Sequence, residues 1–340
     1  MKAAVFEGAG SVAIKDVKAP LLDNGDILLK VSAVGVCPTD VKAYFNGSSS
    51  IKVPRILGHE VSGTIHDTQS SHFALGERVN VAADNPCMKC DRCQRGLHNL
   101  CRNITSLGVN IDGGYAEYMR VPKEFIGNGM VNRVSDSVSD LEATFMEPVA
   151  VSLNALSLIN PKKSDSAVVI GDGPNAMIHL QLLKRVYSVK RVTVTGMVKG
   201  RLQLSKKLGA DMAIDVVSEP EEIKALGNDT DIVDITIGNS KAMEQAMLLA
   251  DSGTRIVIFG GSVNDTQIPI SMNDAHYRQL TITGSTGTSL PHYAEAAKIV
   301  NSGLLDLKDL ISETFPLENI RGAFTYSKEL KGIKGAIVFS

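Results

Sequence analysis

Four of the five cysteines fall within a short stretch whose spacing suits a metal ion: Cys87, Cys90, Cys93 and Cys101. Four thiolates complete the closed tetrahedral shell of a structural zinc ion. Disulfides among them are disfavoured, because such closely spaced cysteines do not easily meet the required Cα separations and directions. The spacing therefore predicts a structural zinc site. Inert buried thiols and a redox pair are the alternatives, and a redox pair leaves the remaining cysteines unexplained.

A second group of possible zinc ligands is scattered along the chain: Cys37, His59 with Glu60, and Glu147. Each of them alone is more often an ordinary core residue. Glu147 is the informative one, because its neighbours are apolar and an unpaired buried carboxylate is very costly. A thiolate, an imidazole and one or two carboxylates would form a zinc site with an open position, which is the catalytic arrangement.

The segment Gly171-Asp172-Gly173-Pro174-Asn175-Ala176 leaves an apolar strand and opens a helix. In this Gly-x-Gly-x-x-Ala pattern the first glycine permits a tight turn, and the second lets the backbone approach a pyrophosphate. The small third residue lets the helix pack on the strand. The segment therefore predicts a nicotinamide dinucleotide site. The candidate cofactor contacts are Gly171, Gly173, Pro174, Asn175, Ala176, Gly196, Lys199, Arg201 and Ser285.

An absence near Gly196 bears on which dinucleotide binds. NAD-using folds of this kind carry an acidic residue about twenty residues beyond the glycine turn, where it binds the adenosine ribose and repels a 2′-phosphate. Gly196 stands at that place, and Lys199 and Arg201 follow it. Both cations are suited to a phosphate group. We therefore expect NADP to be preferred, with NAD possible, and Gly196→Asp to reverse the order; a solvated Lys199 is the alternative.

The pattern of apolar residues changes along the chain, and this change indicates which elements position these residues. Up to about residue 150 it reads as short β-rich segments with little helical periodicity, and from Ser166 strands alternate with helices. Such alternation predicts a parallel sheet covered on both faces. The expected strands are 27–34, 76–82, 114–121, 167–171, 191–195, 213–216, 231–237, 254–259, 280–284 and 335–339. The expected helices include 175–186, 202–208 and 293–302.

Length and composition exclude several classes of protein. The 340 residues suggest roughly two domains at about 150 residues each, and 44% hydrophobic residues supply packed cores. A net charge of -2 lacks the basic excess of a nucleic-acid binder. No run approaches the 18 or so apolar residues of a membrane span. We expect a cytoplasmic protein that binds neither nucleic acid nor membrane.

Together these motifs resemble the zinc-containing medium-chain dehydrogenases, which include alcohol, sorbitol and threonine dehydrogenases. Gly58-His59-Glu60, followed by Gly63 and the stretch 76–79, resembles the zinc signature of that family. The segments 87–101, 112–118, 147–148 and 315–317 also resemble it. Glu147 stands where many alcohol dehydrogenases carry cysteine, which makes the chain more similar to the polyol and threonine branch.

The resemblance implies an α/β fold with two domains. Residues 1–150 would form a GroES-like β-rich catalytic domain that binds zinc, and residues 151–288 a doubly wound Rossmann domain. Residues 289–340 would return to the catalytic domain. It also implies a homodimer or homotetramer, two zinc ions per chain, and an active site in the cleft.

The resemblance further implies roles for individual residues. Cys37, His59 and Glu147 would hold the catalytic zinc, with Glu60 as an alternating ligand or close neighbour. Thr39 would pass on the proton of the alcohol, and Asp40 would orient His59. Lys42 stands where relatives often end a proton relay with histidine, and a solvated side chain is the alternative for it.

The implied activity is reversible hydride transfer between a nicotinamide cofactor and a secondary alcohol, polyol or sugar. A different class is a non-catalytic nucleotide-binding sensor or interaction module on the same fold. A third is a zinc ribbon that docks on a protein partner, which leaves Cys37, His59 and Glu147 without a use. Counting zinc separates them, because two ions per chain favour the enzyme.

Overall fold

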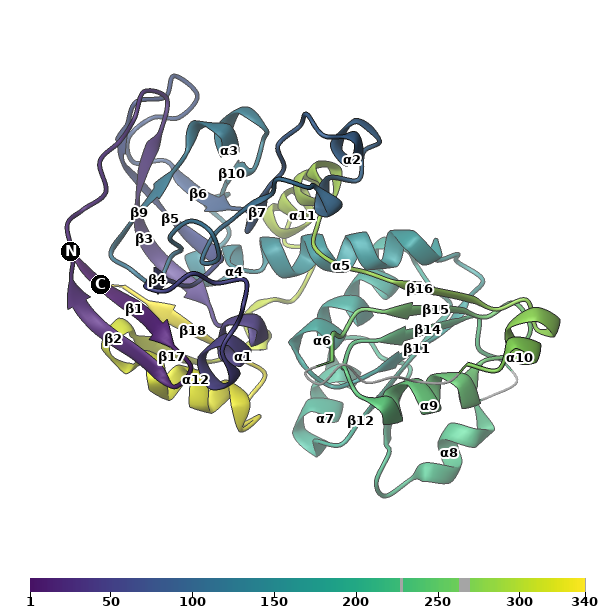
Figure 1. The fold of residues 1–340 in the computed structure, drawn as a ribbon. Coiled ribbons are helices and arrows are strands. Elements are labelled where there is room, and N and C mark those ends of the chain that lie inside the picture. The colour runs from purple at the N-terminus through teal and green to yellow at the C-terminus, as the bar shows by residue number, and fades with distance from the viewer. Residues whose placement is uncertain (227–228, 263–269, 340) are drawn as a thin grey trace. The chain divides into compact units, whose positions relative to one another are not determined.

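A computed structural model describes residues 1–226, 229–262 and 270–339, and its contacts divide the chain into two compact units (Figure 1). The first unit comprises residues 1–150 and 287–340, and the second comprises residues 151–286. The domain bounds expected from the sequence, at 150 and 288, stay a prediction. Within the described residues, no helix has the length and apolarity needed to cross a bilayer.

The first unit is built on a mixed sheet around β3 (Ile27–Gly35). Side chains alternate between the faces of a strand, and on β3 the residues Ile27, Leu29, Val31 and Ala33 are all buried. The sheet order is β10-β6-β5-β3-β18-β17, with β9 also paired to β3. These strands are β5 (Glu60–Thr68), β6 (Arg78–Val81), β9 (Tyr118–Val121), β10 (Val131–Arg133), β17 (Ile311–Pro316) and β18 (Lys334–Val338).

Smaller elements surround this sheet. The order β2-β1-β4 makes a three-stranded sheet, and β7 pairs with β8. Their bounds are β1 (Lys2–Gly8), β2 (Ser11–Asp16), β4 (Arg55–Ile56), β7 (Asp84–Asn85) and β8 (Thr105–Ser106). The helices are α1 (Pro38–Asn46), α2 (Asp91–Gln94), α3 (Lys123–Gly127), α4 (Asp140–Ala143), α11 (Leu290–Asn301) and α12 (Ile320–Lys328), with 3-10 turns at His98–Leu100, Lys308–Leu310 and Leu317–Asn319.

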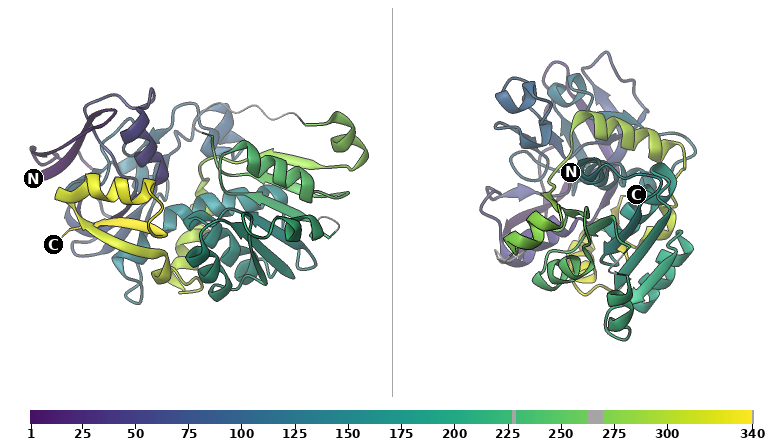
Figure 2. Two further views of the ribbon diagram at one scale, coloured as in Figure 1. Left: turned by 90° about the horizontal axis from the view of Figure 1, so that it is seen from below. Right: turned by 90° about the vertical axis from the view of Figure 1, so that its right-hand side faces the viewer.

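The C-terminal segment completes the first unit. Strand β18 pairs antiparallel with β3 and parallel with β17. Helix α12 buries Ile320, Ala323 and Phe324, which lie on one helical face. The yellow C-terminal elements accordingly lie beside the purple N-terminal strands in all views (Figures 1 and 2). The C-terminal strand therefore belongs to the same sheet as β3, which ends two residues before Cys37, and β5, which begins at Glu60.

The second unit holds a six-stranded parallel sheet in the order β13-β12-β11-β14-β15-β16. In chain order this is 3-2-1-4-5-6, the doubly wound arrangement expected from the sequence. The strands are β11 (Ser166–Ile170), β12 (Arg191–Gly196), β13 (Met212–Asp215), β14 (Ile232–Ile235), β15 (Arg255–Ile258) and β16 (Thr281–Gly284). Chain order reverses between β11 and β14, and ligands bind beyond the carboxyl ends of the strands at such a switch point.

Helices cover this parallel sheet (Figures 1 and 2). Those that contact its strands are α6 (Pro174–Gln181), α7 (Lys199–Lys207), α8 (Pro220–Ala225) and α9 (Ser240–Leu249). Helix α10 (Met272–Tyr277) belongs to the same unit, but none of its residues is buried. The helix expected over 175–186 is α6 followed by a π-helical turn at Leu182–Val186. The longest helix, α5 (Met146–Ile159), runs from the first unit into the second.

One expectation about the first unit was wrong, and one helix was not predicted. The strand expected over 114–121 is regular only at Tyr118–Val121, because the backbone at Gly114 and Tyr115 instead donates to the carbonyls of Gly58 and Leu57. Helix α5 was not expected at all. Its residues are buried on most sides, so the sequence shows no amphipathic period.

Candidate metal centres and cofactor site

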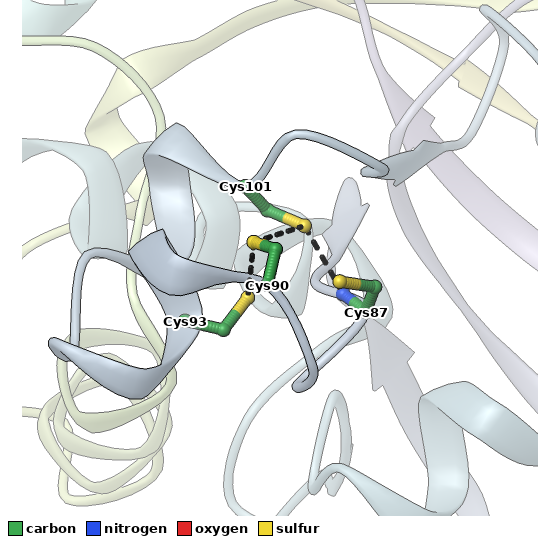
Figure 3. Close-up of side chains that lie close together, drawn as sticks. All are labelled: Cys87, Cys90, Cys93 and Cys101. Carbon is green, nitrogen blue, oxygen red and sulfur yellow. Dashed lines mark hydrogen bonds between the residues drawn. The ribbon is translucent and has the colours of Figure 1, made fainter.

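Four of the five cysteines, Cys87, Cys90, Cys93 and Cys101, converge on one point (Figure 3). The Sγ atom of Cys90 lies 3.6 Å from that of Cys93 and 3.9 Å from that of Cys101. Zinc–sulfur bonds of about 2.3 Å in a tetrahedron require sulfur–sulfur separations of roughly 3.8 Å. No disulfide joins the cysteines, and all four Sγ atoms lie within 4.8 Å of one another. Both the donor set and its spacing fit a closed zinc site.

Local backbone structure builds this cluster. Cys90 is the N-cap of the short helix α2, which carries Cys93. The backbone N–H groups of Cys87 and Asn103 donate to the Sγ of Cys101 at 3.2 and 3.4 Å. Backbone hydrogen bonds from Arg102 and Cys93 lower the pKa of Cys90 to about 6. Hydrogen bonds to a thiolate favour its charged form, whereas burial raises the pKa of Cys93 to about 12 and also raises that of Cys101.

A second cluster brings together Cys37, His59 and Glu60, whose ligand atoms lie within 4.8 Å of one another. Cys37 precedes helix α1, and His59 directly precedes strand β5. The register of β3 and β5 sets Glu60 opposite Gly35, two residues before Cys37. Sulfur, nitrogen and oxygen donors of this kind suit zinc. The structure thus assembles three of the four ligands that the sequence proposed for a catalytic metal.

Asp40 contacts the His59 ring, and Tyr115 in turn binds Asp40. Asp40 Oδ1 lies 3.5 Å from His59 Nδ1, and the hydroxyl of Tyr115 donates to Asp40 Oδ2 at 3.0 Å. Burial disfavours the charged imidazole, but Asp40 and Cys37 raise the pKa of His59 well above its ordinary value. The surroundings of the ring are therefore strongly negative and favour a cation. With Nδ1 directed at Asp40, Nε2 is the nitrogen left to face a metal.

Glu60 forms a buried ion pair with Lys334, which the sequence did not predict. Lys334 Nζ lies 2.6 Å from Glu60 Oε2, and both side chains are 4% exposed. Lys334 is the first residue of β18, so the C-terminal strand supplies it. The pair occupies the space beside Gly35, where a Cβ atom would lie only 2.0 Å from Glu60 Oε2. The sole sequence signal was a lysine at the start of an apolar strand.

We expect Lys334→Met to lower the free energy of unfolding by about 2 kcal/mol, because the substitution leaves the Glu60 carboxylate buried without its counter-charge. The double variant Lys334→Met/Glu60→Gln should lose less. Urea denaturation measures both.

The exposed pair of Lys2 with Glu318 supplies the control, since Lys2→Met removes a similar contact at the surface and should leave the unfolding curve nearly unchanged. An unfolding midpoint that Lys334→Met does not shift would contradict the importance of the buried pair.

Glu147 lies outside the three-residue cluster among the described residues. It sits in the first turn of α5, is buried, and accepts the backbone N–H of Ala83 at 3.2 Å. Burial, followed by the nearby carboxylate of Asp84, raises its pKa to about 8. The charges of His59 and Glu60 also act on the pKa of Glu147, with His59 lowering it and Glu60 raising it. Asp84 was not expected; it is bound by the Ser106 hydroxyl at 2.5 Å.

The residues assigned to proton transfer lie on helix α1. Thr39 is exposed in the first turn, two residues beyond Cys37, and Lys42 is exposed one turn later. Asp40, between them, is buried. The roles of Thr39 and Lys42 stay predictions.

In the second unit the glycine turn joins β11 to α6. Gly173 is the N-cap of α6 and Pro174 its first residue, while Ala176 is fully buried. Asn175 follows Pro174 in the same first turn, and Gly171 follows the last residue of β11. The N-terminus of a helix favours negatively charged phosphates. Ser285, just beyond β16, accepts a hydrogen bond from Asn154 at 3.4 Å.

The sequence predicted that no carboxylate lies at the end of β12, but the structure places one there. Gly196 has no side chain, but the carboxylate of Asp172 fills the adjoining space. Asp172 Oδ2 accepts the backbone N–H groups of Met197 and Val198 at 2.8 and 2.9 Å. Arg201 is buried, with Nη1 3.5 Å from Asp172 Oδ1. A carboxylate is therefore supplied here by the glycine turn, and Arg201 already faces it.

Two protein families match most of the chain. Residues 23–131 match the family described as the alcohol dehydrogenase GroES-like domain, and residues 176–302 match the family described as zinc-binding dehydrogenase. A sorbitol dehydrogenase from Bacillus subtilis (strain 168) is 28% identical, over 97% of this chain and 94% of its own length.

Two solved structures share the fold over nearly the whole of both chains. An alcohol dehydrogenase from Escherichia coli CFT073, complexed with NADH, has a TM-score of 0.90 at 27% identity, covering 100% of this chain and 99% of its own. A protein from Sinorhizobium meliloti 1021, described as a zinc-binding dehydrogenase and bound to NADP, has a TM-score of 0.92 at 25% identity, covering 99% of each chain.

Proposed function

Because the chain belongs to the zinc-containing medium-chain dehydrogenase family, we propose that it uses a nicotinamide cofactor to oxidise a secondary hydroxyl of a polyol or sugar, reversibly. The chain is an oxidoreductase of the alcohol and polyol class. Beyond this class, we propose a substrate type, a metal content and roles for individual residues.

The convergence of Cys37, His59 and Glu60 carries this proposal. Cys37 precedes α1, while the adjacent residues His59 and Glu60 lie at the start of β5. A thiol, an imidazole and a carboxylate that meet in this way form a donor set suited to zinc. A sensor that only binds a nucleotide has no need of such a site. The zinc-ribbon alternative accounts for Cys87 to Cys101 alone.

We assign Cys37, His59 and Glu147 as ligands of the catalytic zinc, with Glu60 held beside them by Lys334. When bound there, zinc supplies Lewis-acid polarisation of the substrate oxygen. Asp40 orients His59, and the exposed hydroxyl of Thr39 takes the proton that leaves the substrate hydroxyl and passes it toward solvent. A bound nicotinamide would supply the acceptor for the hydride that leaves the carbon bearing that hydroxyl.

The substrate class rests on polar groups and on relatives. Apart from the ligands assigned above, Asp84 places a carboxylate near His59, and a carboxylate accepts hydrogen bonds from the additional hydroxyls of a polyol. The Bacillus subtilis relative is a sorbitol dehydrogenase. Both points favour a polyhydroxylated substrate over a simple alcohol.

We further propose two zinc ions per chain, one in each cluster. A homodimer or homotetramer in the cytoplasm completes the proposal. Zinc analysis of the purified protein tests the metal content, and light scattering tests the assembly. We do not propose the NADP preference that was expected from the sequence. That expectation required the end of β12 to lack a carboxylate, but the carboxylate of Asp172 lies there.

A turnover panel tests the proposed activity. Polyols, aldoses, simple secondary alcohols and L-threonine are each assayed with NAD and with NADP. We expect a polyol or sugar to show the highest kcat/KM and simple secondary alcohols to be at least about tenfold poorer, since a pocket that hydrogen-bonds hydroxyls discriminates against substrates that lack them. Turnover of none of these substrates by protein containing two zinc ions would favour the non-catalytic sensor.

A further inference from the structure

We propose that Asp172, in the glycine turn, takes the role of the missing acidic residue at the end of β12 and makes NAD rather than NADP the preferred cofactor. This inference rests on the proposed nicotinamide-dependent function. It concerns only the second unit, where each participating side chain and backbone group is described.

Three positive features meet at the end of β12. The backbone N–H groups of Met197 and Val198 point to one place, and Val198 is the N-cap of helix α7. Valine has no side-chain acceptor with which to cap that helix. The guanidinium of Arg201 approaches the same place and is 8% exposed. Two N–H donors, a helix N-terminus and a buried cation together form an anion site.

Asp172 occupies that anion site. Its Oδ2 atom accepts both N–H groups, and its Oδ1 atom faces Arg201. A 2′-phosphate on the adenosine ribose would need the same donors, because it is recognised just beyond the second strand of this fold. It would have to displace a carboxylate or lie against one, and like charges at such range repel. The neutral 2′-hydroxyl of NAD instead finds an acceptor, since a carboxylate oxygen can accept more than one hydrogen bond.

Gly196 is part of the same arrangement. A Cβ atom at this position would lie 2.5 Å from both the Cβ and Oδ2 atoms of Asp172. Because Gly196 has no side chain, the carboxylate of Asp172 from the neighbouring turn fits beside the strand end. For the same reason Gly196→Asp alone does not test the cofactor preference, because the two side chains cannot share the site.

The experiment measures binding directly. The chain contains no tryptophan, so the fluorescence of NADH and NADPH can be followed with little protein background, and calorimetry with 5′-AMP and 2′,5′-ADP isolates the 2′-phosphate. We expect the wild type to bind NADH at least about tenfold more tightly than NADPH, and Asp172→Ala to shift that ratio at least about tenfold toward NADPH. Asp172→Asn, which keeps the side-chain shape, should shift it in the same direction.

Asp215→Asn provides the matched control. Asp215 stands opposite Gly196 on the adjacent strand β13 and accepts the backbone N–H of Val217 at 2.9 Å. Its substitution removes the same charge from the same edge of the sheet without opening the anion site. We expect it to change the ratio less than about threefold, which is the scale of an exposed charge.

The outcomes separate this inference from the proposed function. Equal binding of NADH and NADPH by the wild type, or a ratio that neither Asp172 variant changes, overturns the inference. A clear NADH preference lost in Asp172→Ala supports it even if no alcohol in the panel is oxidised, in which case only the proposed function fails. Failure of the wild type to bind any of the four probes overturns both.

Discussion

Replacing Cys37 by alanine is expected to lower kcat/KM by at least about a thousandfold, because several kcal/mol of transition-state stabilisation come from a correctly held metal ion. Cys37 is the thiolate of the three-residue cluster, and the hydrogen-bonded cysteine cluster at 87–101 does not depend on it. The variant should therefore retain one zinc ion per chain. Steady-state kinetics with the best substrate of the panel, together with zinc analysis, measure both effects.

The thermal midpoint of Cys37→Ala should stay close to that of the wild type, since Cys37 is only partly buried and the surrounding sheet does not depend on its side chain. This separates a lost metal from a lost fold. Full turnover by a variant that has lost one zinc ion would exclude Cys37, His59 and Glu60 as a catalytic centre.

Replacing Cys93 by serine is expected to have the complementary effect. Cys93 is buried, and its sulfur is 3.6 Å from that of Cys90. Serine is a poor zinc ligand, so the loop loses the metal that joins its ends, and the free energy of unfolding should fall by at least about 3 kcal/mol. Urea denaturation with and without a chelator measures the loss, because chelation should destabilise the wild type and leave Cys93→Ser nearly unaffected.

Enzyme of the Cys93→Ser variant that remains folded should keep most of its kcat. The cluster at 87–101 and the cluster of Cys37, His59 and Glu60 share no ligand. A thermal midpoint equal to that of the wild type would contradict a structural zinc at this site, and a selective loss of kcat with unchanged stability would assign the cysteines to catalysis instead.

The fold class could be predicted because its signals are local and repeated. The expected strands at 167–171, 191–195 and 280–284 correspond to β11, β12 and β16 within one residue at each end. Buried parallel strands read as apolar runs, and each is bounded by a turn or a helix. Helix α5 was missed for the opposite reason, since a helix buried on most sides shows no periodic pattern. Its omission also hid the element that presents Glu147.

The catalytic cluster could be predicted only in part. Cys37, His59 and Glu60 carry recognisable residue types, and the strand register brings them together. Asp84 has no such signal: it is a single acidic residue at the start of the two-residue strand β7, and only the packing of α5 places Glu147 near it. The sequence also gives no indication that Lys334 belongs to this site, because its partner Glu60 lies in a strand far away along the chain.

By itself the sequence determined the spacing of the four cysteines, the glycine turn and the alternation of strands and helices, since each depends on residues close together along the chain. Only the tertiary structure decided which charges meet. Lys334 reaches Glu60 because β18 pairs with β3. Asp172 reaches the end of β12 because β11 and β12 run parallel and Gly196 leaves the space beside it open. Such pairings depend on strand register and on the neighbouring volume, neither of which local spacing records.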